Sequence, residues 1–311
     1  MSSSSTETPR AHKARLSIVV IAFNGRELLE RCLDALARET RDHDVETLVV
    51  SKSPRAQILQ SDVSLVGKVD IRWFEVEPDA TVPQMRGRGI AESQGELVGL
   101  IEDDCLVQPG WCAALLKAHD APAAAIGGAI EPRPYRRALD WAVYFCDYGR
   151  FMPPLAAGAA VALPGNNMSY KRRALDDLPA ALRSEFQEVF IHRAWEQRGV
   201  PMLTDPAILV RNVNSWTMAD LTAIPYHHAR AFAGGRMAGQ PIWRRVAMGL
   251  LTPLLPVVKV LRVAREAVSR GRYIGALLRT IPMISILAIS WSIGECVGYL
   301  TGPGRSAARW K

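Results

Sequence analysis

Short apolar runs alternate with amphipathic stretches in the first part of the chain. Each run is rich in β-branched residues and ends at a turn residue or a charge, a pattern typical of strands buried inside a parallel sheet. The expected strands are residues 16–23, 45–51, 71–76 and 97–101. Helices are expected after Asn24, over residues 83–94 and after Pro109. This alternation predicts an α/β fold with an open, mostly parallel sheet flanked by helices.

Two of the expected helices carry a possible start signal. Asn24 and Glu27 have the spacing of a capping box, in which two side chains satisfy free N–H groups at a helix start. Ser184 and Gln187 have the same spacing, ahead of a helix expected over residues 185–198. Residues 127–170 are rich in proline, glycine and aromatic side chains, and we expect them to be irregular.

The composition changes near residue 241, where longer apolar stretches begin. Residues 256–270 predict a basic amphipathic helix. Its expected apolar face holds Val257, Val260, Leu261, Ala264 and Val268, and its polar face holds Lys259, Arg262, Glu266 and Arg270. Residues 281–300 carry only one charge, Glu295, and are near the minimum length of a membrane span, although Pro282, Gly294 and Gly298 weaken a simple span.

These patterns divide the chain into three expected parts. Residues 1–15 form a disordered tail, residues 16–240 an α/β domain, and residues 241–311 a helical region that associates with a membrane. Packing of this last region against the α/β domain is the alternative to membrane contact.

The charge and cysteine content narrow the environment of the protein. The chain has 311 residues and a formal net charge of +7, and its basic residues are not interleaved with a nucleic-acid-binding motif. We therefore expect no nucleic acid partner, and the excess charge suits an anionic membrane or a phosphorylated ligand. Five cysteines without a CxxC pair favour a reducing cytosol over disulfides or structural zinc. The run at 16–23 is too short for a signal peptide.

Three adjacent acids, Glu102, Asp103 and Asp104, follow the strand at 97–101. Like charges at this spacing raise each other's pKa, and a bound Mg²⁺ or Mn²⁺ would remove that cost while sharing substrate phosphates. Phe23 and Asn24 end the first strand at the same edge, where open parallel sheets bind ligands. We expect a metal and diphosphate site there, and an acidic loop that caps the next helix is the alternative.

Two polar segments could contact a substrate. Arg86 and Arg88 lie among glycines before the acidic strand and could bind phosphate, or could form an exposed basic turn. Asn166 and Asn167 could offer donors and acceptors to a polyhydroxylated acceptor, or could form a tight turn.

A general base is a further candidate feature. Glu188 lies early in the helix expected at 185–198, where its carboxylate could take a proton if it faces the cleft. Glu185 and Glu196 are alternatives, and a solvated glutamate with no role is the ordinary fate of such a residue.

The order of these features resembles the family-2 glycosyltransferases, which have the GT-A fold. The resemblance spans residues 16–236 and rests on SIVVIAFN at 17–24, RGRGI at 86–90, LIEDD at 100–104, PGW at 109–111 and GNNMSY at 165–170. The ending at 288–304 is similar to the membrane-proximal tail of some bacterial members. The resemblance implies inverting transfer of a sugar from a nucleotide diphosphate.

The resemblance also implies roles for particular residues. Glu102 and Asp104 would take the outer positions of the family's Asp-x-Asp motif and hold a divalent cation, Mn²⁺ or Mg²⁺, with Asp103 contacting the donor between them. Glu188 would take the place of the base that activates the acceptor. The other expected donor contacts are Ala22, Phe23, Asn24 and Arg86, and the expected acceptor contacts are Asn166 and Asn167.

Two departures from the family pattern keep other functions open. The second strand ends in VVSKS at 49–53 without the acid that holds a nucleoside, and the helix at Glu188 lacks a paired Glu-Asp. A catalytically degenerate, membrane-bound nucleotide-sugar-binding protein would show such changes. A sugar-phosphate nucleotidyltransferase is a third possibility, for which AFNG at 22–25 is a poor glycine-rich loop.

The expected partners follow from these assignments. They are a nucleotide sugar, a glycan or lipid-linked acceptor and the membrane surface. We expect the protein at the cytoplasmic face of the cell membrane, in bacterial cell-surface glycan, glycolipid or polysaccharide synthesis.

Overall fold

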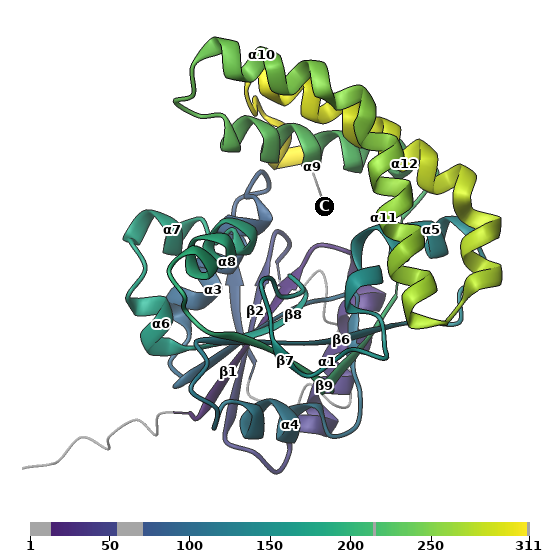
Figure 1. Ribbon diagram of the computed structural model, residues 1–311. Coiled ribbons are helices and arrows are strands. Elements are labelled where there is room, and N and C mark those ends of the chain that lie inside the picture. Colours follow the sequence, from purple (N-terminus) through teal and green to yellow (C-terminus); the bar gives the residue numbers. More distant parts are fainter. Residues whose placement is uncertain (1–13, 55–70, 214–215, 310–311) are drawn as a thin grey trace, which may run out of the picture.

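A computed structural model describes residues 14–54, 71–213 and 216–309. Within them, the strands form one mixed sheet in the order β3-β2-β1-β4-β8-β6-β9-β5, with β7 paired to β9 (Figure 1). The parallel half consists of β3 (Ile71–Glu75), β2 (Val45–Ser51), β1 (Leu16–Ala22) and β4 (Leu97–Glu102). The predicted fold is confirmed, and the tail predicted at 1–15 lies largely outside the described residues.

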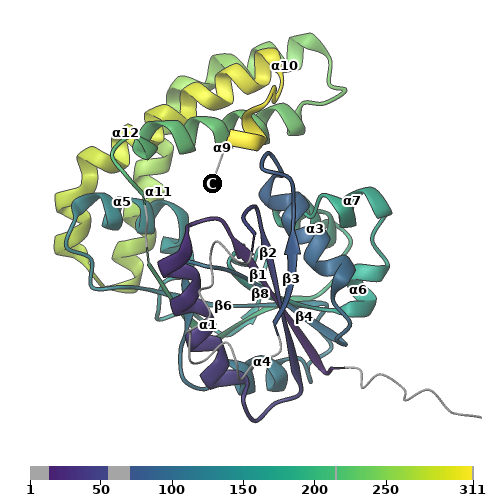
Figure 2. The same cartoon turned by 180° about the vertical axis from the view of Figure 1, so that it is seen from behind.

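Helices bury both faces of this sheet, which explains why its strands are apolar at consecutive positions. In β1, Leu16, Ile18 and Val20 belong to one core, and Val19 and Ile21 belong to the other. The first core is covered by α1 (Arg26–Thr40) and α4 (Trp111–Ala118), and the second by α3 (Val82–Glu92) and α8 (Glu188–Gln197) (Figure 2).

The second half of the sheet corrects the prediction that residues 127–170 are irregular. They include most of β6 (Ala125–Pro132), α5 (Ala138–Asp147), the 3₁₀ turn η2 (Gly149–Phe151), β7 (Gly158–Ala159) and the start of β8 (Asn167–Lys171). Here glycine marks close packing, because a Cβ on Gly128 would lie 1.8 Å from the Ile208 carbonyl oxygen of the neighbouring β9 (Met202–Asn212).

Both predicted capping boxes are wrong. The helix α1 begins after Gly25 without a side-chain cap, because Asn24 bonds to Asp103 instead. Ser184 ends the short helix α7 (Ala180–Ser184), which follows α6 (Arg172–Asp176), and α8 starts after Gln187 without a cap. A capping box does occur at Thr81 and Gln84, at the start of α3.

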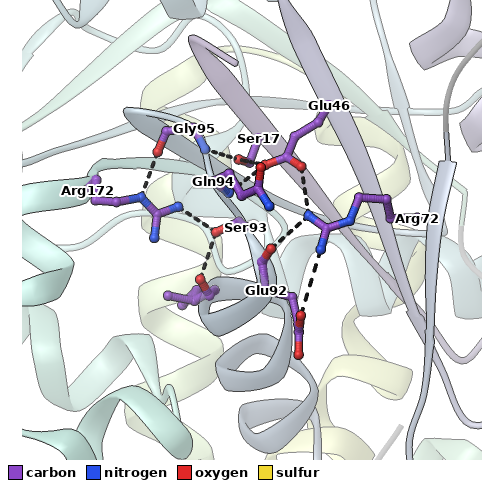
Figure 3. Close-up of polar contacts among 9 residues, drawn as sticks. Ser17, Glu46, Arg72, Glu92, Ser93, Gln94, Gly95 and Arg172 are labelled. Carbon is purple, nitrogen blue, oxygen red and sulfur yellow. Dashed lines mark hydrogen bonds and ion pairs between the residues drawn. The ribbon is translucent and has the colours of Figure 1, made fainter. Parts of the chain in front are cut away.

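A polar network fixes the other end of α3, at the amino edge of the parallel strands (Figure 3). Glu46 of β2 accepts hydrogen bonds from the Ser17 hydroxyl at 2.5 Å and from Arg72 at 2.9 Å. Arg72 also donates to the Glu92 carbonyl at 2.9 Å, and Arg172 donates to the Gly95 carbonyl at 2.7 Å. These bonds hold the turn between α3 and β4, so the position of β4 is set from this edge.

The C-terminal helices form an arc on the side to which the parallel strands point (Figures 1 and 2). They are α9 (Asp220–Arg236), α10 (Ile242–Leu251), η3 (Thr252–Leu254), α11 (Leu255–Arg270), α12 (Ile274–Thr301) and η4 (Ser306–Arg309). The arc therefore faces the edge where the acidic triplet was predicted to lie.

The two glycines that weaken residues 281–300 as a membrane span lie at contacts between α12 and α9. A Cβ on Gly294 would lie 2.3 Å from the Tyr226 carbonyl oxygen, and one on Gly298 would lie 2.5 Å from that of Arg230. Glu295 is buried and accepts hydrogen bonds from Trp291 and Tyr299, each at 2.6 Å, with Arg236 3.1 Å away. One side of α12 is thus packed on protein along its length.

The other side of this region is apolar and exposed, and it includes three residues of the predicted apolar face of α11. The helix packs inward through Val263 and Ala267, while Val257, Leu261 and Val268 are 62%, 63% and 59% exposed. Two segments, Ile242–Arg270 and Ile274–Thr301, are long and apolar enough to cross a membrane by length and composition.

The glycine contact between α9 and α12 generates a first prediction. Gly294→Ala should lower the free energy of unfolding by about 1–3 kcal/mol, because the two helices must separate to admit the methyl group. Gly275→Ala on the same helix meets nothing within 4 Å and should be neutral or stabilising. Denaturant unfolding of the full chain in neutral detergent measures both, and equal stability of the two variants would contradict the contact.

Candidate active site

The acidic triplet lies where β4 ends. Glu102 is its last residue, Asp103 and Asp104 form the turn, and β5 (Cys105–Val107) begins directly after them. The end of β1 lies alongside, since Ile21 pairs with Glu102. The sequence therefore placed the triplet and the Ala22–Asn24 segment on the same edge correctly.

Asp103 joins these two strand ends. It is 1% exposed, and it accepts hydrogen bonds from the backbone N–H groups of Phe23 and Asn24 at 3.0 and 2.8 Å, and from the Asn24 amide at 2.8 Å. Burial raises its pKa to about 7, against the effect of these donors. Both carboxylate oxygens accept these bonds, so Asp103 holds the loop of Phe23 and Asn24 in place.

Asp104 is buried, and no Lys, Arg or His of the described residues forms an ion pair with it. It accepts hydrogen bonds from the Asn212 amide at 2.9 Å and the Cys105 thiol at 3.2 Å, both from neutral groups. Burial and the charges of Glu102 and Asp103 raise its pKa well above the usual range. Such a carboxylate favours a divalent cation as partner, so its chemistry fits the expected metal.

Arg86 connects three elements at this edge. From α3, its guanidinium donates to Glu102 of β4 at 2.9 Å, to Glu188 at the start of α8, and to the Gly165 carbonyl at 3.0 Å. The three charged side chains are only 6%, 13% and 15% exposed. Burial and the charge of Glu188 raise the pKa of Glu102, and Arg86 opposes the shift. The structure thus brings together the predicted phosphate ligand, metal ligand and base, bound to one another.

The two asparagines differ in what they can reach. Asn167 is fully buried and bonded to the carbonyls of Ala129 and Ile208 and to Trp111, so it holds strands together and does not face an acceptor. Asn166 is 2% exposed, and among the described residues neither its amide nitrogen nor its oxygen has a hydrogen-bond partner. It follows Gly165, where a Cβ would lie 2.9 Å from Glu188, so Asn166 keeps its expected place beside the site.

Sequence reasoning missed residues that surround the triplet from elsewhere in the chain. Asn212 comes from β9, and Tyr148 follows α5, where burial and the charges of Asp104 and Glu102 raise its pKa. Asp147 lies near both Glu102 and Lys259 of α11, and partial removal from water raises its pKa to about 7. No pattern in the sequence singled out Asn212, and Asp147 and Tyr148 lay in the stretch expected to be irregular.

The donor set for a metal at this edge is small. Within the described ranges, no group of three or more His, Cys, Asp and Glu side chains is arranged to hold an ion. Asp104 and Glu102 supply the oxygen ligands that Mg²⁺ and Mn²⁺ accept, and such ions commonly complete their shells with water and substrate phosphate. Two protein carboxylates are therefore sufficient for a shared site.

The mixed, mostly parallel sheet flanked by helices is GT-A-like. The model of the family described as Glycosyl transferase family 2 matches residues 17–178, and the chain belongs to this family. No curated protein matches the chain.

The chain is similar to several solved structures. The mannosyltransferase PcManGT from Pyrobaculum calidifontis, in complex with GDP-Man and Mn²⁺, is 15% identical with a TM-score of 0.50, and the match covers 96% of this chain and 86% of that one. The structure of residues 1–349 of TarS from S. aureus is 12% identical with a TM-score of 0.45, covering 91% and 90%.

The three buried charges of Arg86, Glu102 and Glu188 generate a prediction about stability. Arg86→Met should lower the free energy of unfolding by about 3–5 kcal/mol, because two buried carboxylates lose their shared cation. Adding Glu102→Gln and Glu188→Gln to that variant should restore most of the loss. Chemical unfolding of the single and triple variants measures the difference, and a triple variant no more stable than the single one would show that the charges are not coupled.

Proposed function

We propose that this protein transfers a sugar, with inversion, from a nucleoside diphosphate donor to an acceptor hydroxyl in bacterial surface glycan, glycolipid or polysaccharide synthesis. Membership of the family supports the use of a nucleotide-sugar donor. The observation that carries the proposal is the buried Asp104, whose hydrogen-bond donors among the described residues are neutral. It lies beside Glu102, at the strand end next to Phe23 and Asn24.

The donor would occupy the edge between β1 and β4. Ala22 and Phe23 would border the nucleoside, and Asn24, held by Asp103, would fix the shape of that loop. Asp104 and Glu102 would hold Mn²⁺ or Mg²⁺, which neutralises charge on the leaving diphosphate when bound. The mannosyltransferase from Pyrobaculum calidifontis, whose complex contains GDP-Man and Mn²⁺, supports manganese as the first ion to test.

Glu188 is the proposed base that takes the proton from the acceptor hydroxyl. Its carboxylate is paired with Arg86, so it would be free to take the acceptor proton when Arg86 turns to the donor diphosphate. A guanidinium forms two parallel hydrogen bonds with a phosphate, and these bonds would compensate Arg86 for the loss of its bond to one carboxylate. Asn166, with no described partner, would contact the acceptor next to Glu188.

The pairing of Glu102 and Glu188 with Arg86 also favours the second candidate function. A degenerate family member that binds a nucleotide sugar without turnover would keep these acids neutralised. Release of sugar from a panel of nucleotide sugars, with and without Mn²⁺, separates the two functions. The family match disfavours the sugar-phosphate nucleotidyltransferase.

We also place the protein at the cytoplasmic face of the membrane, lying in the plane of its surface. On α10, η3 and α11, Trp243, Leu250, Leu254 and Leu261 are 69%, 75%, 61% and 63% exposed. Arg244 and Arg265 are exposed on the same helices and suit anionic lipid headgroups. The contact of α12 with α9 at Gly294 and Gly298 supports contact with the surface over crossing of the bilayer.

The metal assignment generates a prediction on Asp104. Asp104→Asn should lower the turnover of nucleotide sugar by about a hundredfold or more, because the ion that stabilises the leaving group loses its main ligand. The fold should stay intact, since the asparagine removes an uncompensated buried charge. Asp42→Asn, on an exposed turn, is the matched control. Manganese-dependent turnover close to that of the wild type in Asp104→Asn would contradict Asp104 as a metal ligand.

The membrane assignment is tested by substituting exposed side chains, because such substitutions do not disturb the core of the fold. Replacing Leu250, Leu254 and Leu261 together by Gln should reduce binding to vesicles of phosphatidylglycerol and phosphatidylethanolamine by about a hundredfold. Each leucine, partly buried in the bilayer, would contribute about 1 kcal/mol to the binding free energy. Met218→Gln, also exposed, serves as control. Cosedimentation measures both, and unchanged binding of the triple variant would contradict a surface formed by α10 and α11.

A further inference from the structure

Strand β9 holds Asp104 at both its main chain and its side chain. The Val213 N–H donates to the Asp104 carbonyl oxygen at 2.9 Å, and the Asn212 amide donates to the Asp104 carboxylate at 2.9 Å. Asn212 is only 1% exposed, so bulk water does not compete for its amide. The direction in which the Asp104 carboxylate points therefore depends on how the Asn212 amide is oriented.

The Asn212 amide can bond to Asp104 in one orientation only. A carboxylate that binds a metal ion is ionised, and an ionised carboxylate accepts hydrogen bonds but donates none. The amide must therefore turn its nitrogen towards Asp104 and its oxygen away. A hydrogen-bond donor on the oxygen side would fix this orientation, because the flipped amide would then lose two hydrogen bonds at once.

Tyr135 supplies a donor on that side of the amide. Its hydroxyl lies 2.8 Å from Asn212 Oδ1 and 3.0 Å from the Asn212 carbonyl oxygen. The strand pairing explains the contact, because Pro132 at the end of β6 is opposite Asn212 and Tyr135 follows three positions later. Since Oδ1 accepts from this hydroxyl, the amide nitrogen is left to face Asp104.

The aromatic cluster of α5 holds Tyr135 in turn. The Trp141 ring nitrogen donates to the Tyr135 carbonyl oxygen at 3.1 Å, and the two rings meet edge to face with centres 5.5 Å apart. Tyr144 lies beside both rings, but its hydroxyl donates to the Ile130 carbonyl oxygen at 2.7 Å. Two tyrosines of one cluster therefore donate to different partners, and only the bond from Tyr135 continues to Asp104.

We propose that Tyr135 and Asn212 are positioning residues that orient the Asp104 carboxylate towards the metal ion. The inference rests on the proposed function, in which Asp104 holds Mn²⁺ or Mg²⁺, and it adds two residues that act on the ion without touching it. A carboxylate oriented in advance loses less freedom when the ion binds, so its affinity for the ion is higher. Removing a group that hydrogen-bonds to a metal ligand typically costs about 10–100-fold in metal affinity.

The test measures Mn²⁺ binding to the full chain in neutral detergent, so it needs no turnover. Bound Mn²⁺ is measured from the loss of the electron paramagnetic resonance signal of the free aquo ion. Asn212→Leu should weaken Mn²⁺ binding about tenfold or more, because the carboxylate loses its amide donor. Tyr135→Phe should weaken it about three- to tenfold, because the amide stays but loses the group that fixes its orientation. Tyr135→Phe removes a single oxygen, so it decides the question if Asn212→Leu fails to fold.

Tyr144→Phe is the matched control, because it also removes one hydroxyl hydrogen bond from the α5 aromatic cluster. It should lower the midpoint of chemical unfolding about as much as Tyr135→Phe does and leave Mn²⁺ affinity unchanged. The positioning role is overturned if Tyr135→Phe binds Mn²⁺ like the wild type, or if Tyr144→Phe weakens binding equally.

A double variant tests whether Tyr135 acts through Asn212. In Asn212→Leu the hydroxyl has no amide left to orient, so adding Tyr135→Phe should change Mn²⁺ affinity by less than about twofold. A loss in the double variant equal to the product of the two single losses would overturn this route.

Asp104→Asn and nucleotide-sugar turnover keep the two ideas distinct. If Asp104→Asn loses Mn²⁺ while Tyr135→Phe and Asn212→Leu keep it, the positioning role fails and the proposed function stands. If all three variants lose Mn²⁺ and the wild type cleaves no nucleotide sugar, the proposed transfer fails and the positioning role stands. A wild type that binds no Mn²⁺ overturns both.

Discussion

One buried guanidinium holds the active-site edge together. Arg86 reaches from α3 to the end of β4 and the start of α8, and without it Glu102 and Glu188 would repel each other at low dielectric. The same group fixes the passage of Gly165, because its carbonyl is the third acceptor. A ligand that draws Arg86 away would therefore leave two buried acids without their shared cation at once.

The sequence allowed the parallel half of the sheet and the place of its acids to be predicted, because strands buried on both faces leave uninterrupted apolar runs. It did not allow the partners of those acids to be predicted. The spacing of Asn24 and Glu27 suggested a local cap, yet Asn24 bonds to Asp103, which is 79 positions away and brought near only by the pairing of β1 with β4. The glycine-rich stretch that contains Gly128 was expected to be irregular for the same reason, because the close approach of Gly128 to β9 cannot be seen before the strands are paired.

The C-terminal helices show how the same residues can indicate two structures. Gly294, Glu295 and Gly298 interrupt an apolar stretch in the sequence, and in the fold they are the face by which α12 meets α9. The hydrophobic residues on the opposite side of α12 do not contact α9. Apolar content alone could not decide between a spanning helix and a packed one, because that choice depends on which side of the helix has protein beside it.

The two faces of α11 also set a height. A helix with its side chains is about 10–12 Å across, so a group held on its inner face stands roughly one helix diameter above whatever its outer face rests on. Arranged in this way, the protein would act on a hydroxyl close to the point where an acceptor leaves the bilayer. A long glycan, with its free end far out in the solvent, would have to fold back to be reached, which favours an early step in the growth of a chain.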